Sequence, residues 1–413
     1  MDPLGKLRRH RPARLASALA GSVAGCLVIA ACGSSGASAT GGGQGGDTYK
    51  VMVISNSVAG PKLAEAFPQI ADGAKAGVLA VNAAGGVNGR KVQIQTCETK
   101  GDPNAAVECA RQAITEHLPA VVGSFDLVGT YLSVLQSAGI PAIGSWPVAE
   151  ELTNPIAYPV WGGGTGITAA MISYLVKQKH AKSIALVLTD TAADSQIPAV
   201  VAPIVAANPG VKVNEVIIPA NTVDYSAVVA KALQNQGIAL GAEPTDVAAF
   251  LKALGQSGQT RPLVASVAAI PESFISQLPD SADGMYGISG FLPASLTSNS
   301  AVATFNRYMN AVDPTADKDN FAENAYASVL LFADAVKGLH TVDGSTVTQA
   351  LQTTGSFNLG LLPPVSFRRS QAPIAALTRF FNPDVMYVQL QNQTWIAPTT
   401  QFYNAYTGAP TAG

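Results

Sequence analysis

The feature that most constrains the fold of this chain is a regular alternation of short apolar runs with longer stretches of helical periodicity. The runs are rich in Val, Ile and Leu, and the first of them reads YKVMVIS. Such an alternation predicts β-α-β units and parallel sheets, because parallel strands need a crossover helix between them. The expected strands are 49–55, 90–96, 120–124, 140–145, 183–190, 211–218, 238–241 and 261–266.

The intervening stretches predict helices, and the alternation falls into two groups. The Asp102-Pro103 pair is typical of a helix start, because Asp caps the first free N–H groups and Pro fits the first turn. A Pro/Gly-rich stretch at 155–166 separates the group 49–145 from the group 183–289. The segment 377–396 predicts a pair of strands around Asn382-Pro383. The expected helices are 69–84, 102–116, 128–137, 166–178, 195–207, 224–235, 245–256, 298–312, 321–339 and 345–355.

The stretch NAAGGVNGRKV, residues 82–92, joins a helix to a strand. Gly85 and Gly86 can end the helix, because glycine adopts the left-handed conformation at little cost. Asn88-Gly89 then favours a tight turn into the following strand.

The N-terminus has the pattern of an export signal. Basic residues between Lys6 and Arg14 precede an apolar run, Leu15 to Ala31, which ends at Ala-Ala-Cys32-Gly. This end resembles the bacterial lipobox, so residues 1–31 are predicted to be a lipoprotein signal peptide and Cys32 the lipidated residue. Residues 32–47 form a Gly/Ser-rich, flexible tether. The alternatives are a plain signal peptide or a short membrane anchor. The route, Sec or twin-Arg, stays open.

Composition excludes disorder and gives no sign of nucleic-acid binding. Hydrophobic residues make up 48% and charged residues 13% of the chain, and its net charge is −2. The predicted signal peptide holds a net positive charge, so the remainder is more acidic than the whole. Cys97 and Cys109 face an oxidising exterior after export and are either a disulfide or two buried thiols. Two cysteines are too few for a zinc site.

The sequence offers no set of residues for catalysis. It has no G-x-S-x-G, H-E-x-x-H or Walker A motif. After the signal peptide, His117, His180 and His340 remain, each near a predicted helix end, where a capping role is the simpler reading. We therefore expect no enzyme, no cofactor and no metal.

The order of elements and motifs resembles the type I periplasmic binding proteins, in the Leu/Ile/Val-binding branch of ABC importer receptors. The resemblance covers roughly 48–395. It rests on Asn82-Ala83, Gly85-Gly86-Val87, Gly89-Arg90, Asp102-Pro103, Val121-Val122-Gly123 and Ile140-Pro141. It implies an α/β fold of two Rossmann-like lobes with parallel central sheets, joined by hinge strands. The ligand would lie between the lobes, beyond the carboxyl ends of the strands.

The same resemblance implies lobe boundaries and partners. The N-terminal lobe would comprise 48–160 plus about 290–340, and the C-terminal lobe 161–289 plus about 341–400. The protein would be a monomer on the outer face of a membrane, delivering a small molecule to ABC permease subunits. A ligand-sensing receptor and a structural lipoprotein are the alternatives.

Family members that bind amino acids use hydroxyl groups after two strands of the first lobe and a Tyr and an acid from the second. Here the two hydroxyl positions hold Leu127 or Val128, and Val148. The loop that often carries the Tyr begins at Thr191, and the loop that often carries the acid reads Ser266-Val267-Ala268-Ala269, so a plain α-amino acid is disfavoured. The ligand is predicted to be branched-chain-amino-acid-like or more apolar or aromatic. Phe125 and Trp146 either form an apolar wall of the ligand site or pack in the core. Asp126 and Glu243 either supply a negative charge to the site or are solvated loop acids. The predicted ligand-binding residues are Ser57, Phe125, Asp126, Leu127, Trp146, Pro147, Val148, Thr191, Glu243 and Val267.

Overall fold

The computed structural model describes residues 48–60, 66–126, 128–190 and 197–411. The predicted signal peptide, the tether, Cys32, Leu127 and Thr191 lie outside the described residues. None of the helices in the described ranges is both long and apolar enough to cross a membrane.

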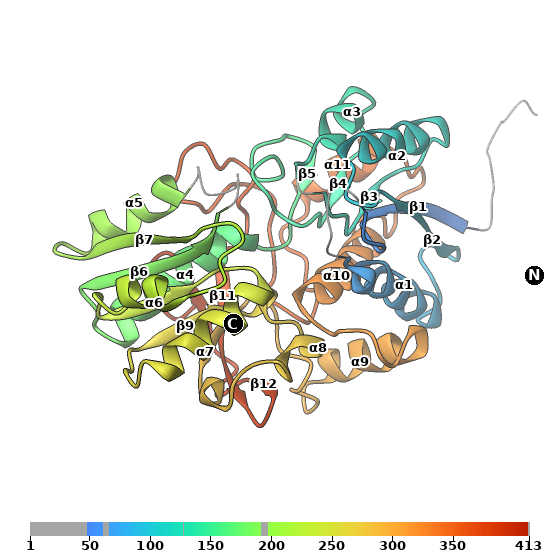
Figure 1. Ribbon diagram of the computed structural model, residues 1–413. Coiled ribbons are helices and arrows are strands. Elements are labelled where there is room, and N and C mark those ends of the chain that lie inside the picture. The colour runs from blue at the N-terminus through green and yellow to red at the C-terminus, as the bar shows by residue number, and fades with distance from the viewer. Residues whose placement is uncertain (1–47, 61–65, 127, 191–196, 412–413) are drawn as a thin grey trace, which may run out of the picture. The chain divides into compact units, whose positions relative to one another are not determined.

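The first lobe is built on a parallel sheet of five strands in the order β2-β1-β3-β4-β5. The apolar run at 49–55 becomes its buried inner strand, β1. Figure 1 shows α2 and α3 on one side of this sheet and α1 and α10 on the other. The elements are β1 (Thr48–Ser55), α1 (Pro68–Ala83), β2 (Lys91–Glu98), α2 (Pro103–Thr115), β3 (Val121–Val122), α3 (Tyr131–Ser137), β4 (Ala142–Ile143) and β5 (Ala157–Tyr158).

The second lobe is built on an eight-stranded sheet in the order β12-β11-β10-β9-β8-β6-β7, with β13 paired to β11. The strands β6 to β10 run parallel, as predicted, and β11 is antiparallel to β10. The strands are β6 (Ser183–Thr189), β7 (Lys212–Ile218), β8 (Gly237–Leu240), β9 (Leu263–Ser266) and β10 (Tyr286–Ser289). The helices are α4 (Gly163–Gln178), α5 (Ile197–Ala207), α6 (Ser226–Ala232), α7 (Pro244–Gln256), α8 (Glu272–Ile275) and the 3₁₀ turns η2 (Val267–Ala269) and η3 (Asp280–Ala282).

After β10 the chain returns to the first lobe. Helices α9 (Ser300–Val312) and α10 (Asn320–Ala335) both pack against α1. Contact is close, since a Cβ on Gly73 of α1 would lie 2.2 Å from the carbonyl oxygen of Ala322. Helix α11 (Gly344–Thr353) also contacts the first lobe, because Gln352 donates a hydrogen bond to the Tyr158 hydroxyl. We therefore propose that α11 belongs to the first lobe and that the lobe boundary lies further along the chain than residue 341.

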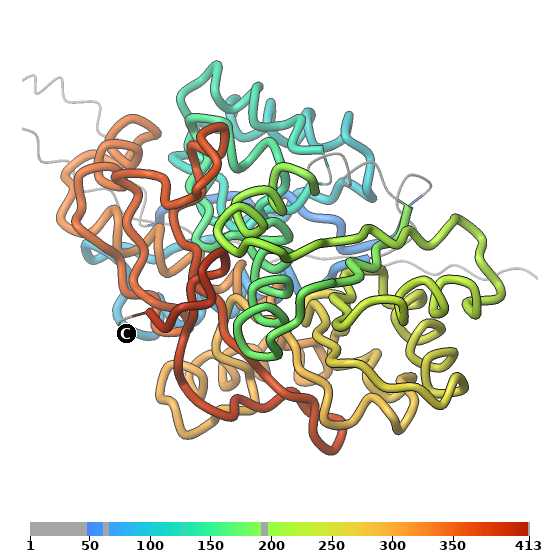
Figure 2. Tube along the Cα trace, turned by 90° about the vertical axis from the view of Figure 1, so that its left-hand side faces the viewer, coloured from blue at the N-terminus to red at the C-terminus, as the bar shows by residue number. Residues whose placement is uncertain are grey.

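The C-terminal segment differs from its prediction. Residues 377–381 form no strand, so the expected strand pair around Asn382-Pro383 is wrong. The hairpin instead consists of β11 (Asp384–Gln391) and β12 (Thr394–Ile396), and it turns at Asn392 and Gln393, which both have positive φ. Strand β13 (Phe402–Asn404) follows, and the residues after it contact α4, because Ser173 donates a hydrogen bond to the carbonyl oxygen of Tyr406. Figure 2 draws this last segment in dark red.

Contacts between the connections fasten the two lobes together. A Cβ on Gly290 would lie 2.0 Å from the Trp161 ring, so only glycine leaves room for this indole. Trp161 also packs against Phe291, and Asn382 donates to the carbonyl oxygen of Val160 at 3.0 Å. The connections are residues 159–162, 290–299 and 377–383. These connections are where the predicted hinge between the two lobes would lie.

Two local predictions are confirmed. Gly85, Gly86, Asn88 and Gly89 all have positive φ between α1 and β2, as expected for a helix stop followed by a tight turn. Cys97 and Cys109 form a disulfide between β2 and α2, with Cα atoms 5.8 Å apart.

Candidate functional site

The carboxyl ends of parallel strands are where ligands bind in open α/β folds. In the first lobe, the segments after β3 and β4 place Phe125 and Trp146 there, and both side chains are buried. Their rings belong to an aromatic cluster with Phe67 and Phe321. Trp146 stacks on Phe321 with ring centroids 3.8 Å apart, and Phe67 lies 4.7 Å from Phe321 and 5.0 Å from Phe125. Phe125 and Trp146 therefore pack against the cluster, and their role in binding stays a prediction.

A cleft of about 400 Å³ lies in front of this cluster and is lined from both lobes. The first lobe contributes the start of α1 and the start of α10, and the second lobe contributes the start of α7 and the segments around α8. Phe67 and Phe321 form its aromatic wall on the first-lobe side. Its lining residues are Ala66, Phe67, Pro68, Gln69, Pro244, Ala268, Pro271, Ser273, Phe274, Asp317, Asp319 and Phe321.

Asp319 is the buried acid of this cleft. It caps α10, because its Oδ1 accepts hydrogen bonds from the N–H groups of Phe321 and Ala322 at 3.0 and 3.1 Å. Its Oδ2 accepts one from Nε2 of Gln69 at 2.9 Å. The side chain is 5% exposed, and burial raises its pKa to about 7 despite these donors. Keeping Asp319 ionised therefore costs the folded protein free energy.

A second acid, Asp317, makes hydrogen bonds across the cleft. Its two oxygens accept hydrogen bonds from the N–H and the hydroxyl of Ser273, each at 2.7 Å. Asp317 precedes α10 of the first lobe, and Ser273 lies on α8 of the second. These bonds tie the lobes together at one end of the cleft.

None of the predicted ligand-binding residues that the structure describes is among the lining residues of this cleft. Phe125, Asp126, Trp146 and Pro147 are buried, and Val148 is half-buried. Asp126 accepts hydrogen bonds from the N–H and hydroxyl of the neighbouring Thr130. Burial raises its pKa.

Two other predicted residues, Glu243 and Val267, directly precede lining residues in the chain, and Ser57 does not. Glu243 is exposed and precedes Pro244, and Val267 precedes Ala268. Ser57 is half-buried, and its N–H donates to the carboxylate of Glu98. Their roles in binding stay predictions.

Sequence reasoning missed the residues that the tertiary structure brings to the cleft, chiefly Phe67, Phe274, Asp319 and Phe321. One local signal was present, since Asp319 precedes a helical pattern as a capping residue does. A cap by itself does not indicate a binding site, so this signal does not place Asp319 in a cleft.

A separate network of buried acids lies behind the segments after β3 and β4. Tyr131 donates to Glu151 at 3.1 Å and lies 2.8 Å from the Ser145 hydroxyl. The other oxygen of Glu151 has no hydrogen-bond partner among the described residues. Burial raises the pKa of Glu151 to about 8, and the nearby Asp126 carboxylate adds to the rise. No lining residue of the cleft belongs to this network.

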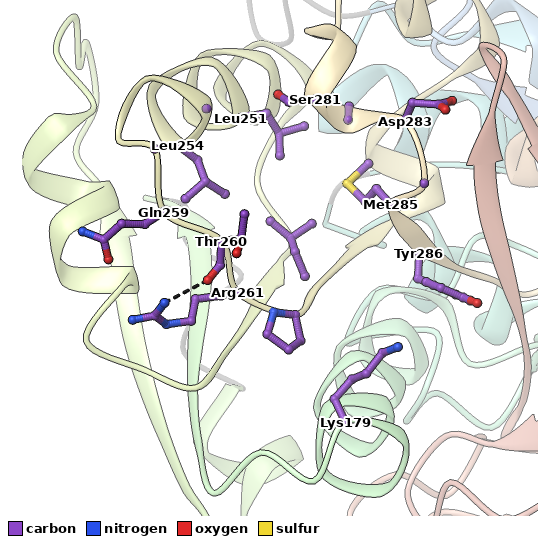
Figure 3. A pocket seen from close by; sticks show the side chains of 16 residues that line it. Lys179, Leu251, Leu254, Gln259, Thr260, Arg261, Ser281, Asp283, Met285 and Tyr286 are labelled. Atoms are coloured by element: carbon purple, nitrogen blue, oxygen red, sulfur yellow. Dashed lines mark hydrogen bonds between the residues drawn. The ribbon is translucent and has the colours of Figure 1, made fainter.

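Another hollow, of about 510 Å³ and so larger than the cleft, lies at the opposite, amino ends of β9 and β10 (Figure 3). Its cationic side chains are already engaged. Arg261 donates to the carbonyl oxygens of Asn235, Thr260 and Leu233, and Lys179 lies over the Tyr286 ring. The strand direction and these contacts favour the interlobe cleft as the ligand site. Nowhere in the described ranges do three or more His, Cys, Asp or Glu side chains group to hold a metal.

Two lobes on largely parallel sheets, joined by three connections with a cleft between them, define the class of two-lobed ligand-binding proteins. Comparison with known families agrees. The sequence profile of the periplasmic binding proteins matches residues 54–382, and the chain belongs to this family. No match was found among curated protein sequences.

Solved structures with this fold include three of interest, each less than 25% identical in sequence. An extracellular ligand-binding receptor from Verminephrobacter eiseniae has a TM-score of 0.70 at 18% identity, over 84% of this chain and 99% of its own. The branched-chain amino acid transporter substrate-binding protein from Streptococcus pneumoniae, solved with isoleucine, has a TM-score of 0.66 at 21% identity, over 85% and 98%. A fatty acid ABC transporter substrate-binding protein from Thermomonospora curvata has a TM-score of 0.69 at 15% identity, over 86% and 92%.

Proposed function

We propose that this protein is an extracytoplasmic solute-binding lipoprotein of an ABC importer, which captures a small molecule between its two lobes. The observation that carries the proposal is the cleft lined from both lobes in a chain of the periplasmic binding protein family. Its volume of about 400 Å³ lies within the range of roughly 300–1,000 Å³ that small-molecule sites occupy.

The mechanism is closure rather than chemistry. A ligand shifts the lobes toward a closed state only if it binds that state more tightly than the open one. Residues from α8 and α10 reach the cleft from opposite lobes, so a ligand that touches both gains contacts only when the lobes meet. Phe67, Phe321 and Phe274 favour an apolar or aromatic ligand body. Structural relatives solved as transporter proteins for branched-chain amino acids and for fatty acids are consistent with an apolar ligand.

The first test is a thermal-shift panel on the chain lacking residues 1–32. The panel holds branched-chain and other amino acids, amides, amines, and aromatic and aliphatic carboxylates. A ligand at 100 times its dissociation constant adds about 2.7 kcal/mol to the free energy of unfolding. Phe274→Ala should weaken the response, whereas Leu254→Ala in the larger hollow should leave it unchanged. No response to any compound contradicts ligand capture.

The anchor and the partner need separate tests. A Cys32→Ser variant should lose metabolic labelling by a fatty acid and appear in the medium, and retained labelling would exclude Cys32 as the lipidated residue. Genes for a permease and an ATPase beside this one favour import, whereas a neighbouring kinase or cyclase gene favours sensing. A single species at the monomer mass in light scattering supports the monomer.

A further inference from the structure

The charged side chains that line the cleft between the lobes are all negative among the described residues. Its described lining includes two carboxylates, Asp317 and Asp319, and no Lys, Arg or His. Lys318 lies between them in the sequence and does not line the cleft; it lines a much smaller neighbouring hollow, which Asp319, Glu272 and Glu323 line as well. An anionic ligand would therefore meet two acids in the cleft with no cationic side chain among the described lining residues, which costs free energy.

The two acids differ in what they already bind. Both oxygens of Asp317 accept hydrogen bonds from Ser273. Asp319 uses one oxygen for the two backbone N–H groups of α10, and its other oxygen accepts only the amide of Gln69. A carboxylate oxygen has room for a second donor, so both acids can accept a further hydrogen bond. Asp317 is only half-buried, whereas Asp319 is buried, so a donor gains more from pairing with Asp319. No cation among the described residues is within ion-pair distance of Asp319, and burial makes its negative charge costly.

The remaining lining suits a cation with an apolar body. Phe67 and Phe321 come from the first lobe and Phe274 from the second, and prolines fill much of the rest. Aromatic ring faces attract organic cations, and they cover the apolar part of a ligand at the same time. A free carboxylate on the same ligand would have no charged partner in the described lining.

We infer that the cleft recognises an organic amine with an apolar or aromatic body, and that Asp319 is the side chain that receives its positive charge. This inference rests on the proposed ligand capture and narrows it to one charge class. It separates the site from one that holds a plain amino acid or a fatty acid, because both of those carry a carboxylate.

The test uses three probes of nearly equal shape: phenethylamine, 2-phenylethanol and 3-phenylpropionate, which are cationic, neutral and anionic at pH 8. Calorimetric titration should give a dissociation constant for the amine about ten- to a hundredfold below those of the other two, as expected when a charge-assisted hydrogen bond is gained. Equal or tighter binding of the alcohol or the carboxylate overturns the inference.

Asp319→Asn is the matched variant, because Asn also caps helices well and the protein should fold normally. This variant should bind phenethylamine about tenfold or more weakly than the parent, and its affinity for 2-phenylethanol should be nearly unchanged. Asp313→Asn makes the same chemical change outside the cleft and should alter neither. Amine binding that survives Asp319→Asn removes the role assigned to this residue.

The broad panel separates the two claims. If only carboxylates or neutral compounds shift the melting temperature, ligand capture stands and the amine inference is overturned. If no compound shifts it, both are overturned.

Discussion

Phe321 is the residue whose removal most directly tests how the cleft wall is held. Its ring is 7% exposed, stacks on Trp146 and lies near Phe67 and Phe125. Phe321→Ala should lower the free energy of unfolding by about 4 kcal/mol, because truncating a buried Phe side chain leaves a cavity in a close-packed core. In a folded body of this size, this loss lowers the melting temperature by about 5 °C, given about 2 cal/mol/K of unfolding entropy per residue.

The measurement is urea unfolding followed by circular dichroism, with the transition midpoint and the slope determined separately. The slope should stay constant, because the unfolded surface is nearly the same. Phe274→Ala is the control from the other side of the cleft. Its side chain is half-buried, so the cost should be about 1–2 kcal/mol. A loss below about 1.5 kcal/mol for Phe321→Ala would refute a tightly packed aromatic wall.

Three further changes test other parts of the structure. Replacing Cys97 and Cys109 by Ser opens a loop with a sequence separation of 12, which should cost about 3 kcal/mol in unfolding; a melting temperature equal to that of the parent under oxidising conditions contradicts this. Gly290→Ala places a Cβ against the Trp161 ring and should lower both the stability and the ligand affinity, since the connection between the lobes must shift; intact affinity would show that the hinge tolerates the shift. Burial raises the pKa of Glu151 to about 8 in the folded protein. The stability that its proton contributes is fully present below the ordinary Glu pKa of about 4.3 and is lost as the pH rises through about 8. Between pH 5 and pH 9 the melting temperature of the parent should therefore fall more than that of Glu151→Gln, and parallel pH profiles would contradict the assignment.

The sequence by itself determined the local elements and their order. The helix at Pro68–Ala83 and the strand Lys91–Glu98 follow from apolar periodicity and from the glycines between them. Asp102 caps α2, as its pairing with Pro103 predicted, by accepting from the N–H of Asn104. These features depend on neighbours a few residues apart, so a pattern in the chain is enough to predict them. The alternation of strands and helices then limits the fold to parallel sheets.

Only the tertiary structure decided which side chains meet. The hairpin of β11 and β12 turns ten residues after Asn382, because β11 pairs with the distant β10 and thereby fixes the register of the whole segment. The cleft depends on similar long-range packing. Gln69 and Asp319 are 250 residues apart in the sequence, and they form a hydrogen bond because α1 packs against α10. Local propensity carries no information about such contacts, and they place a buried acid and an aromatic wall in the same cleft.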